Sequence, residues 1–237
     1  MNCKNPRCVA ACPVNINIPT FIQHVVEGNL KAASDVIMED SSLPSICGRV
    51  CPQETQCEGK CIRGLKGEPI SIGKLERFVA DYALENDIKP EKADCCNGHK
   101  VAVIGSGPAG LSCAYFLAIE GYKPVVFEKQ EKPGGMMMLG IPNFRLEKDV
   151  VNAEIDILRE MGVEIRCGIE VGKNVTIQQL REEGFSGFFV GTGLQNCGKL
   201  GVPGEDAEGV MGGVDYIKSV TLGKAEKLSG DVVIIGG

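Results

Sequence analysis

The stretch Val101-Ala-Val-Ile-Gly-Ser-Gly-Pro-Ala-Gly110 joins a short apolar run to a glycine-rich turn, and it decides the fold of the larger part of the chain. The apolar run predicts a buried strand, and Leu111 to Glu120 predict the helix that follows the turn. A second strand is expected over Lys123-Pro-Val-Val-Phe127, ending at Glu128. A strand, glycine turn, helix and second strand in this order form the βαβ unit that binds dinucleotides.

Each glycine of the turn has its own task in such a unit. Gly105 permits the tight turn, Gly107 lets a pyrophosphate approach the helix N-terminus, and Gly110 allows the helix to pack closely on the strand. Glu128, about 20 residues downstream, is placed to accept hydrogen bonds from a ribose hydroxyl. A purely structural turn is the alternative, and the fingerprint alone does not choose between FAD and NAD.

Two later segments extend the same candidate site. Pro133-Gly-Gly-Met-Met-Met-Leu-Gly-Ile-Pro142 is a glycine-rich loop whose apolar side chains suit a flat ring system, although methionines also fill gaps in a core. Phe185 to Val190 predict a strand that ends at Gly191-Thr-Gly193. Its backbone N–H groups are able to reach a bound cofactor, and a plain turn has the same pattern.

The first 61 residues hold seven of the twelve cysteines, namely Cys3, Cys8, Cys12, Cys47, Cys51, Cys57 and Cys61. Cys8 and Cys47 each begin a Cys-x3-Cys-Pro step, the form in which the cluster motifs of bacterial ferredoxins end. Proline and glycine between cysteines let a short chain wrap around a compact cluster. The spacing therefore favours iron-sulfur clusters.

Three other states of these thiols compete with clusters. Disulfides are disfavoured because the chain opens without a secretory signal pattern. Structural zinc is the stronger alternative, but no Cys-x2-Cys pair occurs and the only histidines are His24 and His99. Unligated thiols are the third alternative. We assign no chemistry to either histidine.

Helical periodicity dominates the region up to about residue 84. One helix is expected to start near Pro19 with Phe21, Ile22, Val25 and Val26 on one face. Another runs from Ile72 through Leu75, Phe78, Val79 and Tyr82.

Farther along the chain, an amphipathic helix is expected from Glu147 to Met161. Its inward residues would be Val150, Val151, Ile155 and Leu158.

The charged stretch from Glu85 to Asp94 carries Pro90 and no periodicity, so the domain boundary is expected there. Cys95 and Cys96 follow it, and we interpret them as incidental thiols because adjacent side chains in a loop rarely converge on one metal.

Composition excludes several classes of protein. A chain of 237 residues with 43% hydrophobic residues and 31 glycines fits one or two soluble α/β domains. Its apolar runs are far shorter than the ~20 residues that a bilayer requires. A net charge of −6 argues against a nucleic-acid partner. We therefore expect a cytoplasmic protein with neither a membrane nor a nucleic-acid partner.

The chain resembles the flavoprotein small subunit of NADPH-dependent glutamate synthase, a family shared with the large subunit of NADH-dependent ferredoxin:NADP oxidoreductase and the N-terminal half of dihydropyrimidine dehydrogenase. The resemblance covers essentially the whole chain. It is carried by Cys3-Lys-Asn-Pro-Arg-Cys8-Val-Ala-Ala-Cys12-Pro, Cys47-Gly-Arg-Val-Cys51-Pro, Cys57-x3-Cys61, Ile70-Ser-Ile-Gly-Lys-Leu-Glu76, Gly105 to Gly110, and Gly140-Ile-Pro-Asn-Phe-Arg145.

The resemblance implies FAD and two 4Fe-4S clusters. One cluster would use Cys12, Cys51, Cys57 and the carboxylate of Glu76, and the other Cys3, Cys8 and Cys61. Spacing alone does not indicate Glu76, which would otherwise be interpreted as a solvent-facing helix carboxylate. The resemblance makes Cys47 a neighbour of a cluster and not a ligand.

The chain departs from the family pattern at both ends, where we expect it to be truncated. The first cysteine of the pattern would fall just before Met1, which leaves the second cluster without its fourth ligand. Either Cys47 substitutes or a three-iron cluster forms, which electron paramagnetic resonance would detect. Asp231-Val-Val-Ile-Ile-Gly-Gly237 looks like the opening of an NADPH domain, or else a closing strand.

We therefore expect an α/β Rossmann-like FAD-binding domain preceded by an all-α iron-sulfur domain. The helical 4Fe-4S domain would span residues 1–90, the incomplete FAD domain 91–231, and the first strand of an NAD(P)H domain 232–237. No catalytic acid or base is assigned. The candidate cofactor-binding residues are Gly105, Gly107, Pro108, Ala109, Gly110, Glu128, Lys129, Gly134, Gly135, Gly140, Ile141, Pro142, Arg145, Gly191, Thr192 and Gly193.

The resemblance implies a function as well. Electrons would pass from NADPH through FAD and the clusters to a glutamate synthase large subunit or a ferredoxin-type partner, in an oligomer. An electron-bifurcating ferredoxin:NADP oxidoreductase subunit is the alternative within the family. A zinc-stabilised nucleotide-binding interaction module is the alternative of another class.

Overall fold

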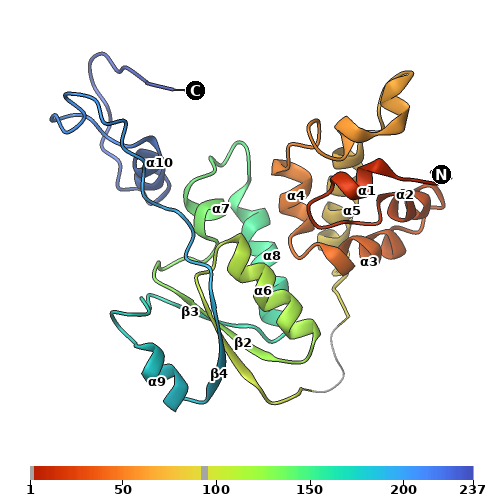
Figure 1. Cartoon of the computed structure of the whole chain (residues 1–237), viewed down its shortest axis with the longest axis horizontal. Helices are drawn as coiled ribbons and strands as arrows, with labels where there is room; N and C mark the ends of the chain where they lie inside the picture. The colour runs from red at the N-terminus through yellow and green to blue at the C-terminus, as the bar shows by residue number, and fades with distance from the viewer. Residues whose placement is uncertain (1–2, 92–95, 237) are drawn as a thin grey trace.

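The computed structural model describes residues 3–91 and 96–236, and these residues fold into a helical part followed by an α/β part (Figure 1). The helical part contains α1 (Arg7–Ala11), α2 (Ile18–Val26), α3 (Leu30–Asp40), α4 (Pro44–Val50), the 3-10 turns η1 (Glu58–Lys60) and η2 (Ile62–Leu65), and α5 (Ile72–Glu85). This agrees with the all-α domain expected from the sequence.

Local sequence explains several helix boundaries. Proline lies in the first turn of α2 and of α4, where its missing N–H is not needed. Asn29 caps α3 by accepting a hydrogen bond from Ala32 N at 3.1 Å. The longest helix of this part, α5, packs against α2, α3 and α4, so its buried face forms the centre of the helical core.

Two of the apolar side chains named for these helices lie outside the core. Val26, the last residue of α2, is 75% exposed and adjoins an exposed turn. Phe78 is 51% exposed, whereas its neighbour Val79 is fully buried. Successive helical residues point about 100° apart, so a narrow interface buries only one of such a pair.

The α/β part is built on a four-stranded parallel sheet of order β3-β2-β1-β4. Its strands are β1 (Lys100–Ile104), β2 (Lys123–Glu128), β3 (Glu164–Cys167) and β4 (Phe185–Val190). The helix α6 (Pro108–Ile119) connects β1 to β2. The predicted βαβ unit and the strand at 185–190 are therefore confirmed.

Helices cover both faces of this sheet, which explains its continuous apolar strands. On one face, Val103 and Val126 pack with α6 and α8 (Lys148–Glu160). On the other face, Ala102 and Val125 pack with Leu180 of α9 (Ile177–Glu182). The predicted amphipathic helix corresponds to α8, and of its four inward residues only Val150 is not fully buried.

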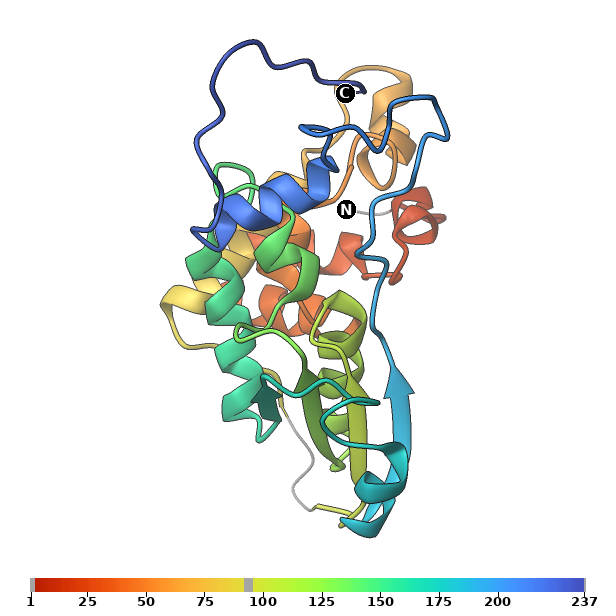
Figure 2. The same ribbon diagram turned by 90° about the vertical axis from the view of Figure 1, so that its left-hand side faces the viewer.

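The segment after β4 differs from the prediction. It contains α10 (Gly213–Thr221), and Figures 1 and 2 show it leaving the carboxyl end of the sheet. The described part of the predicted last strand, residues 231–236, forms no strand, and Val232 to Ile235 are exposed. An apolar run becomes a strand only beside another strand, and none lies next to it among the described residues. Gly237 lies outside the described residues.

One hydrophobic cluster joins the helical and α/β parts. Leu43 and Ile46, at the start of α4, pack in the same cluster as residues of α6 and α8. Tyr115 OH donates to Met38 O at 2.7 Å, and Ser45 N donates to Glu154 Oε1 at 2.6 Å. The end of α3 and the start of α4 are thus both attached to the α/β part.

The connection between the two parts starts where α5 ends, at Glu85, the first residue of the predicted linker. Cys96 is exposed, and Cys95 lies outside the described residues. No helix in the described ranges is long and apolar enough to cross a bilayer.

Candidate cofactor sites

The glycine turn after β1 requires glycine for steric reasons. Gly105 has a φ of +104°, and a Cβ there would lie 2.4 Å from Gly191 O. A Cβ on Gly110 would lie 1.8 Å from Gly105 O, whereas a Cβ on Gly107 would meet open space. The first and third glycines thus serve close backbone packing, and the second faces room for a ligand, as the fingerprint predicts.

The helix α6 starts at this turn without a side-chain cap. Gly107 is the N-cap residue and Pro108 is the first helical residue. No described side chain accepts a hydrogen bond from the first turn. The N–H groups of Ala109 and Gly110 have no intrahelical acceptors either, as in any first turn. Uncapped N–H groups at the positive end of a helix fit a pyrophosphate.

Glu128 is 4% exposed at the end of β2, and the chain holds both oxygens of its carboxylate. Oε2 accepts from Ser106 N at 3.0 Å and from Ser106 Oγ at 2.5 Å, while Oε1 accepts from Gln130 N at 2.9 Å. A carboxylate offers about four lone-pair sites, so acceptor capacity remains for a ribose hydroxyl. Lys129, the next residue, is exposed.

Ser106 was not among the predicted site residues. Its Oγ also accepts a hydrogen bond from Gly134 N at 3.0 Å, so one hydroxyl connects the glycine turn, Glu128 and the later glycine-rich loop. Gly134 has a φ of +116°, and a Cβ on Gly135 would lie 2.7 Å from Gly107 Cα. The two glycine-rich segments therefore touch. The signal in the sequence was a hydroxyl between two fingerprint glycines.

The apolar residues of the later loop lie differently from the expectation. They form the short helix α7 (Gly135–Leu139), in which Met137, Met138 and Leu139 are buried in the shared core. They fill the core, as the alternative interpretation held, and are not free to lie against a ring. Five residues are too few for periodicity to show which face is buried.

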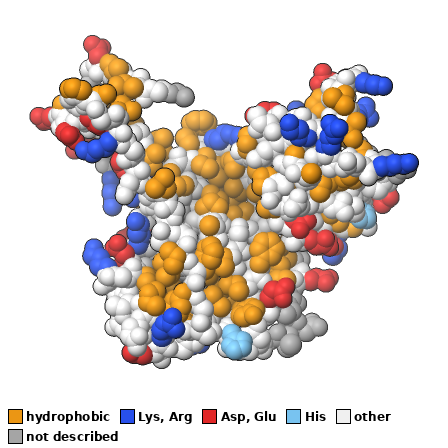
Figure 3. Space-filling model, viewed as in Figure 1, with side chains coloured by type: hydrophobic (Ala, Val, Ile, Leu, Met, Phe, Trp, Pro, Cys, Tyr) orange, Lys and Arg blue, Asp and Glu red, His pale blue; other side chains and the backbone are white. Residues whose placement is uncertain are grey.

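The remaining residues of the predicted site lie near the junction with the helical part and beside the glycine turn. Gly140, Ile141 and Pro142 are half-buried, and Arg145 donates a hydrogen bond to Arg49 O of α4. Gly191 N donates to Ile104 O at 2.8 Å. Thr192 and Gly193 follow it at the surface. Figure 3 shows a hollow lined by hydrophobic side chains between the C-terminal segment and the helical part.

In the first set of predicted cluster ligands, Cys57 and Glu76 are buried, and Cys12 and Cys51 are half-buried. Glu76 on α5 is only 6% exposed, and burial together with the nearby Cys51 raises its pKa to about 8. Burial raises the pKa of Cys57 to about 12, and the neighbouring Glu76 and Cys12 add to the rise. The four predicted ligands are therefore neighbours, and Glu76 is not a solvent-facing carboxylate.

The Glu76 carboxylate accepts no hydrogen bond from any residue that the structure describes. Burying a carboxylate without a partner is costly, so such groups are normally paired or bind metal. The buried thiols beside it are soft anionic ligands of the type that hold iron-sulfur clusters. This set fits a cluster with one carboxylate ligand.

Cys47 belongs beside this first set. The interaction with Cys47 lowers the pKa of the neighbouring Cys51, and Ser41 Oγ donates to Cys47 Sγ at 3.9 Å. The interaction with Cys51, followed by burial, raises the pKa of Cys47 itself far above its usual range. Cys47 therefore lies next to Cys51, one of the predicted ligands.

Close packing of two helices brings these groups together. A Cβ on Gly48 of α4 would lie 2.7 Å from Arg77 Cα of α5, so the two backbones touch beside Cys47 and Glu76. Gly73 of α5 likewise packs on the side chain of Gln53. Neither glycine stands out in the sequence, because each acts through a contact between segments that are far apart along the chain.

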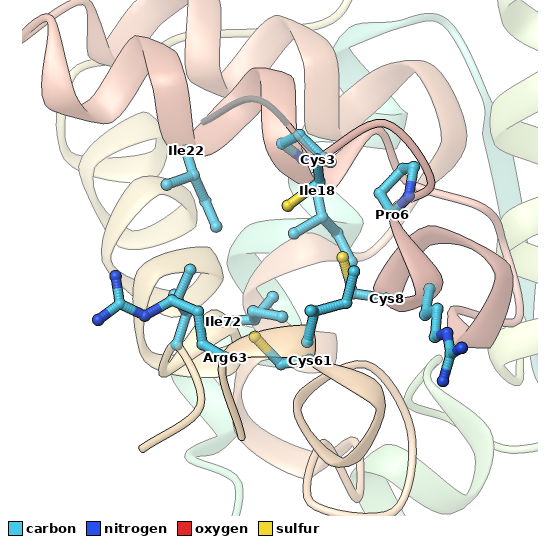
Figure 4. Close-up of a pocket in the computed structure, with 12 residues that line it drawn as sticks. Cys3, Pro6, Cys8, Ile18, Ile22, Cys61, Arg63 and Ile72 are labelled. Carbon is cyan, nitrogen blue, oxygen red and sulfur yellow. The ribbon is translucent and has the colours of Figure 1, made fainter. Parts of the chain in front are cut away.

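The second set lines a pocket of about 230 Å³ in the helical part. Figure 4 shows the sulfur atoms of Cys3, Cys8 and Cys61 directed toward a common space. Burial raises the pKa of Cys8, and the charges of Cys61 and Cys3 add to the rise. Cys47 does not line this pocket, so the structure gives no support to Cys47 as its fourth ligand.

Among the described residues, no three histidine, cysteine, aspartate or glutamate side chains gather closely enough to share one metal ion. Zn–S bonds of about 2.3 Å place the sulfurs of a zinc site about 3.8 Å apart. Ligands of a four-iron cluster stand farther apart because each binds a different iron.

Comparison with known proteins gives matches over both parts of the chain. Residues 1–88 match the family described as dihydropyrimidine dehydrogenase domain II, 4Fe-4S cluster. Residues 99–237 match the pyridine nucleotide-disulphide oxidoreductase family.

Curated relatives include the glutamate synthase [NADPH] small chain of Halomonas elongata, which is 41% identical over 92% of this chain and 46% of its own length. The corresponding small chain of Escherichia coli is 37% identical over the same shares. The NADP(+)-dependent formate dehydrogenase subunit beta of Moorella thermoacetica is 35% identical over 97% of this chain and 35% of its own length. The chain thus spans about half, or less, of the length of these relatives.

A solved structure of 2-naphthoyl-CoA reductase in complex with 2-naphthoyl-CoA is similar in fold. It matches 91% of this chain and 28% of its own length, with a TM-score of 0.51 and 19% sequence identity. At this identity the likeness shows the fold alone. The matches over 1–88 and 99–237 show that the chain belongs to the pyridine nucleotide-disulphide oxidoreductase family, among the iron-sulfur flavoproteins that carry a dihydropyrimidine dehydrogenase-type 4Fe-4S domain before the nucleotide-binding fold.

Proposed function

We propose that this chain is the FAD- and cluster-binding part of an NAD(P)H-dependent electron-transfer oxidoreductase. The observation that carries the proposal is the position of α4. One end of this helix holds Cys47 and Cys51 beside Glu76, while its first turns are hydrogen-bonded to the α/β part through Ser45 and Glu154. The helix α4 therefore connects residues suited to a cluster with the part of the chain that carries residues suited to a dinucleotide.

In this proposal the chain binds FAD through backbone groups. The N–H groups at the start of α6 hold the pyrophosphate, and Gly107 leaves room for it. Glu128, fixed by Ser106 and Gln130, accepts hydrogen bonds from the ribose. When bound, the flavin supplies the exchange between two-electron hydride chemistry and the one-electron chemistry of the clusters.

The cysteine sets hold the clusters in this proposal. Cys12, Cys51, Cys57 and Glu76 form the inner set, and Cys3, Cys8 and Cys61 form the outer set that lines the pocket. Burial of Cys57 and Glu76 limits the access of water to this side of the inner set, and solvent exposure is one of the factors that set the potential of a cluster. No described residue is assigned as a catalytic acid or base.

At a finer level, we propose a glutamate synthase small-subunit-like role, in which a partner subunit accepts the electrons. The identity to the glutamate synthase small chain of Halomonas elongata supports this role, since that relative is a subunit by name. The similarity to the formate dehydrogenase subunit beta supports, as a second candidate, the same electron-transfer module serving another partner, including a ferredoxin-type one.

An anaerobic titration with NADPH tests the proposal on the protein at its natural length. We expect the flavin absorbance to bleach first and reduced-cluster signals to appear in electron paramagnetic resonance as NADPH is added. Flavin that bleaches without any cluster signal, at all NADPH levels, would contradict transfer from the flavin to the clusters.

A further inference from the structure

The two cysteine sets differ in their access to solvent. In the inner set Cys57 and Glu76 are buried and Cys12 and Cys51 are half-buried. In the outer set Cys8 and Cys61 are half-buried and Cys3 is exposed. The outer pocket is lined only by residues 3–72, and none of the lining residues belongs to the α/β part. An acceptor protein can therefore approach the outer set directly.

Cationic side chains surround this outer pocket. The two segments that carry its cysteines, residues 3–9 and 60–68, contain five cations and one carboxylate, Glu68. The cations are Lys4, Arg7, Lys60, Arg63 and Lys66, all exposed. Figure 3 shows lysine and arginine side chains gathered over this end of the helical part.

These cations are not neutralised locally. In the described part of the chain none of the five forms an ion pair, although thirteen ion pairs occur elsewhere in it. Glu58, just before the second segment, accepts a hydrogen bond from Gly73 N at 2.9 Å. In a chain with a net charge of −6, an unpaired cationic surface of this kind is a local exception.

Apolar side chains stand among the cations. On η2, Leu65 is 74% exposed and Ile62 is 42% exposed, and Arg63 lies between them in the sequence. Among the described residues that line the pocket itself, Arg7 and Arg63 alone carry basic side chains. A small apolar contact ringed by charge of one sign is suited to a transient complex that is steered electrostatically.

We propose that this surface, formed by Arg7, Lys60, Ile62, Arg63, Leu65 and Lys66, docks the acidic face of an electron-accepting protein beside Cys3, Cys8 and Cys61. The proposal rests on the proposed function and names the partner's chemistry and its point of contact. The cations steer an acidic partner to the outer set. Ile62 and Leu65 supply an apolar surface from which water is released when the partner docks.

A charge-reversal experiment tests the docking surface. The double variant Arg63→Glu/Lys66→Glu changes two exposed cations without touching a cysteine. The matched control Lys123→Glu/Lys173→Glu makes the same charge change on the α/β part. Each protein, at its natural length and loaded with its cofactors, is reduced with stoichiometric titanium(III) citrate and mixed in a stopped-flow instrument with an acidic [2Fe-2S] ferredoxin as the acceptor probe.

We expect the double variant to slow the second-order reduction of ferredoxin about tenfold at low ionic strength, and the control variant to stay within about twofold of the unchanged protein. The difference should disappear at about 0.5 M salt, where charges are screened within a few Å. Cationic cytochrome c, used as a second probe, should be reduced no more slowly by the variant. The docking proposal would be overturned if the double variant and the control variant reduced ferredoxin at equal rates. It would also be overturned if the lower rate of the double variant did not depend on salt.

The design separates this proposal from the proposed function. Titanium citrate loads the clusters directly, so docking is measured whether or not NADPH is the donor. Equal iron and sulfide contents in all proteins show that the outer site is intact. A protein whose clusters accept no electrons from titanium citrate would refute the electron-transfer function itself, and the docking proposal with it.

Discussion

At the scale of single residues, Glu76 is the group whose environment says most about function. A carboxylate that is 6% exposed, beside the buried Cys57 and without a hydrogen-bond donor among the described residues, is costly unless it binds a cation or is protonated. A cluster iron would satisfy it. The sequence could not indicate this environment, because it arises from contacts between α5 and the loops around α4.

Replacing Glu76 by alanine is expected to remove the inner cluster while leaving the outer one. The iron content of anaerobically purified protein should fall by roughly half, since four of about eight iron atoms would be lost. The matched control Cys47→Ala lies in the same environment but removes no proposed ligand, so its iron content should be unchanged. The same iron loss in both variants would show that the packing matters and not the carboxylate.

Glu154 on α8 gives a prediction about pH. Burial raises its pKa to about 7 from 4.5, against the lowering effects of Ser45 and Arg49. The unfolded chain therefore loses this proton at lower pH than the folded protein does. The neutral Glu154 side chain stabilises the folded protein fully below about pH 4.5, and this stabilisation is lost as the pH rises to about 7. It amounts to about 3 kcal/mol, since each pKa unit corresponds to about 1.36 kcal/mol.

Glu154→Gln removes this titration and keeps an oxygen that accepts from Ser45 N. The free energy of unfolding of the unchanged protein, relative to the variant, should fall by about 3 kcal/mol between about pH 4.5 and 7 in urea denaturation. Parallel pH profiles for the two proteins would show that Glu154 titrates normally.

At the scale of elements, the approach of α4 to α5 builds the inner set. Gly48 lets the two backbones touch, since a Cβ there would lie 2.7 Å from Arg77 Cα, an atom that cannot move without moving α5. The site therefore depends on a residue that carries no chemistry.

Gly48→Ala is expected to separate the two helices and to lower the free energy of unfolding by about 1–3 kcal/mol, the usual cost of overpacking. This loss exceeds the gain of up to about 1 kcal/mol that alanine brings to a helix. Gly67→Ala is the control, because a Cβ at Gly67 meets nothing within 4 Å. Urea denaturation of both variants checks the prediction, which fails if Gly48→Ala is as stable as the control.

The individual elements differ in how well the sequence predicts them. The βαβ unit was predictable because β1, the glycine turn, α6 and β2 are consecutive and each has its own local pattern. The buried face of α7 and the exposed, irregular conformation of residues 231–236 were not. The local pattern around Met137 and Met138 is equally compatible with a surface that binds a ligand and with a hydrophobic core. Val232 to Ile235 are strand-forming residues, but they have no neighbouring strand in the described structure.

At the scale of the whole molecule, one junction holds the two parts together. Arg49 of α4 pairs with Asp81 of α5 at 2.7 Å and with Glu147, just before α8, at 3.1 Å. Ser45 and Glu154, which are joined by a hydrogen bond, are 109 residues apart in the sequence. Such contacts could not be predicted from local patterns, although the two parts themselves could. The junction keeps the inner cysteine set at a fixed position relative to the glycine turn.

Whether this chain holds iron-sulfur clusters beside a dinucleotide site is tested by one measurement. It is the content of iron, acid-labile sulfide, zinc and flavin in the anaerobically purified protein. We predict about seven or eight iron and about eight sulfide per chain, together with bound flavin, since the outer set would hold a three-iron or a four-iron cluster. Zinc without sulfide would contradict it, because the cysteines would then hold a structural metal and the chain would have no route for electrons.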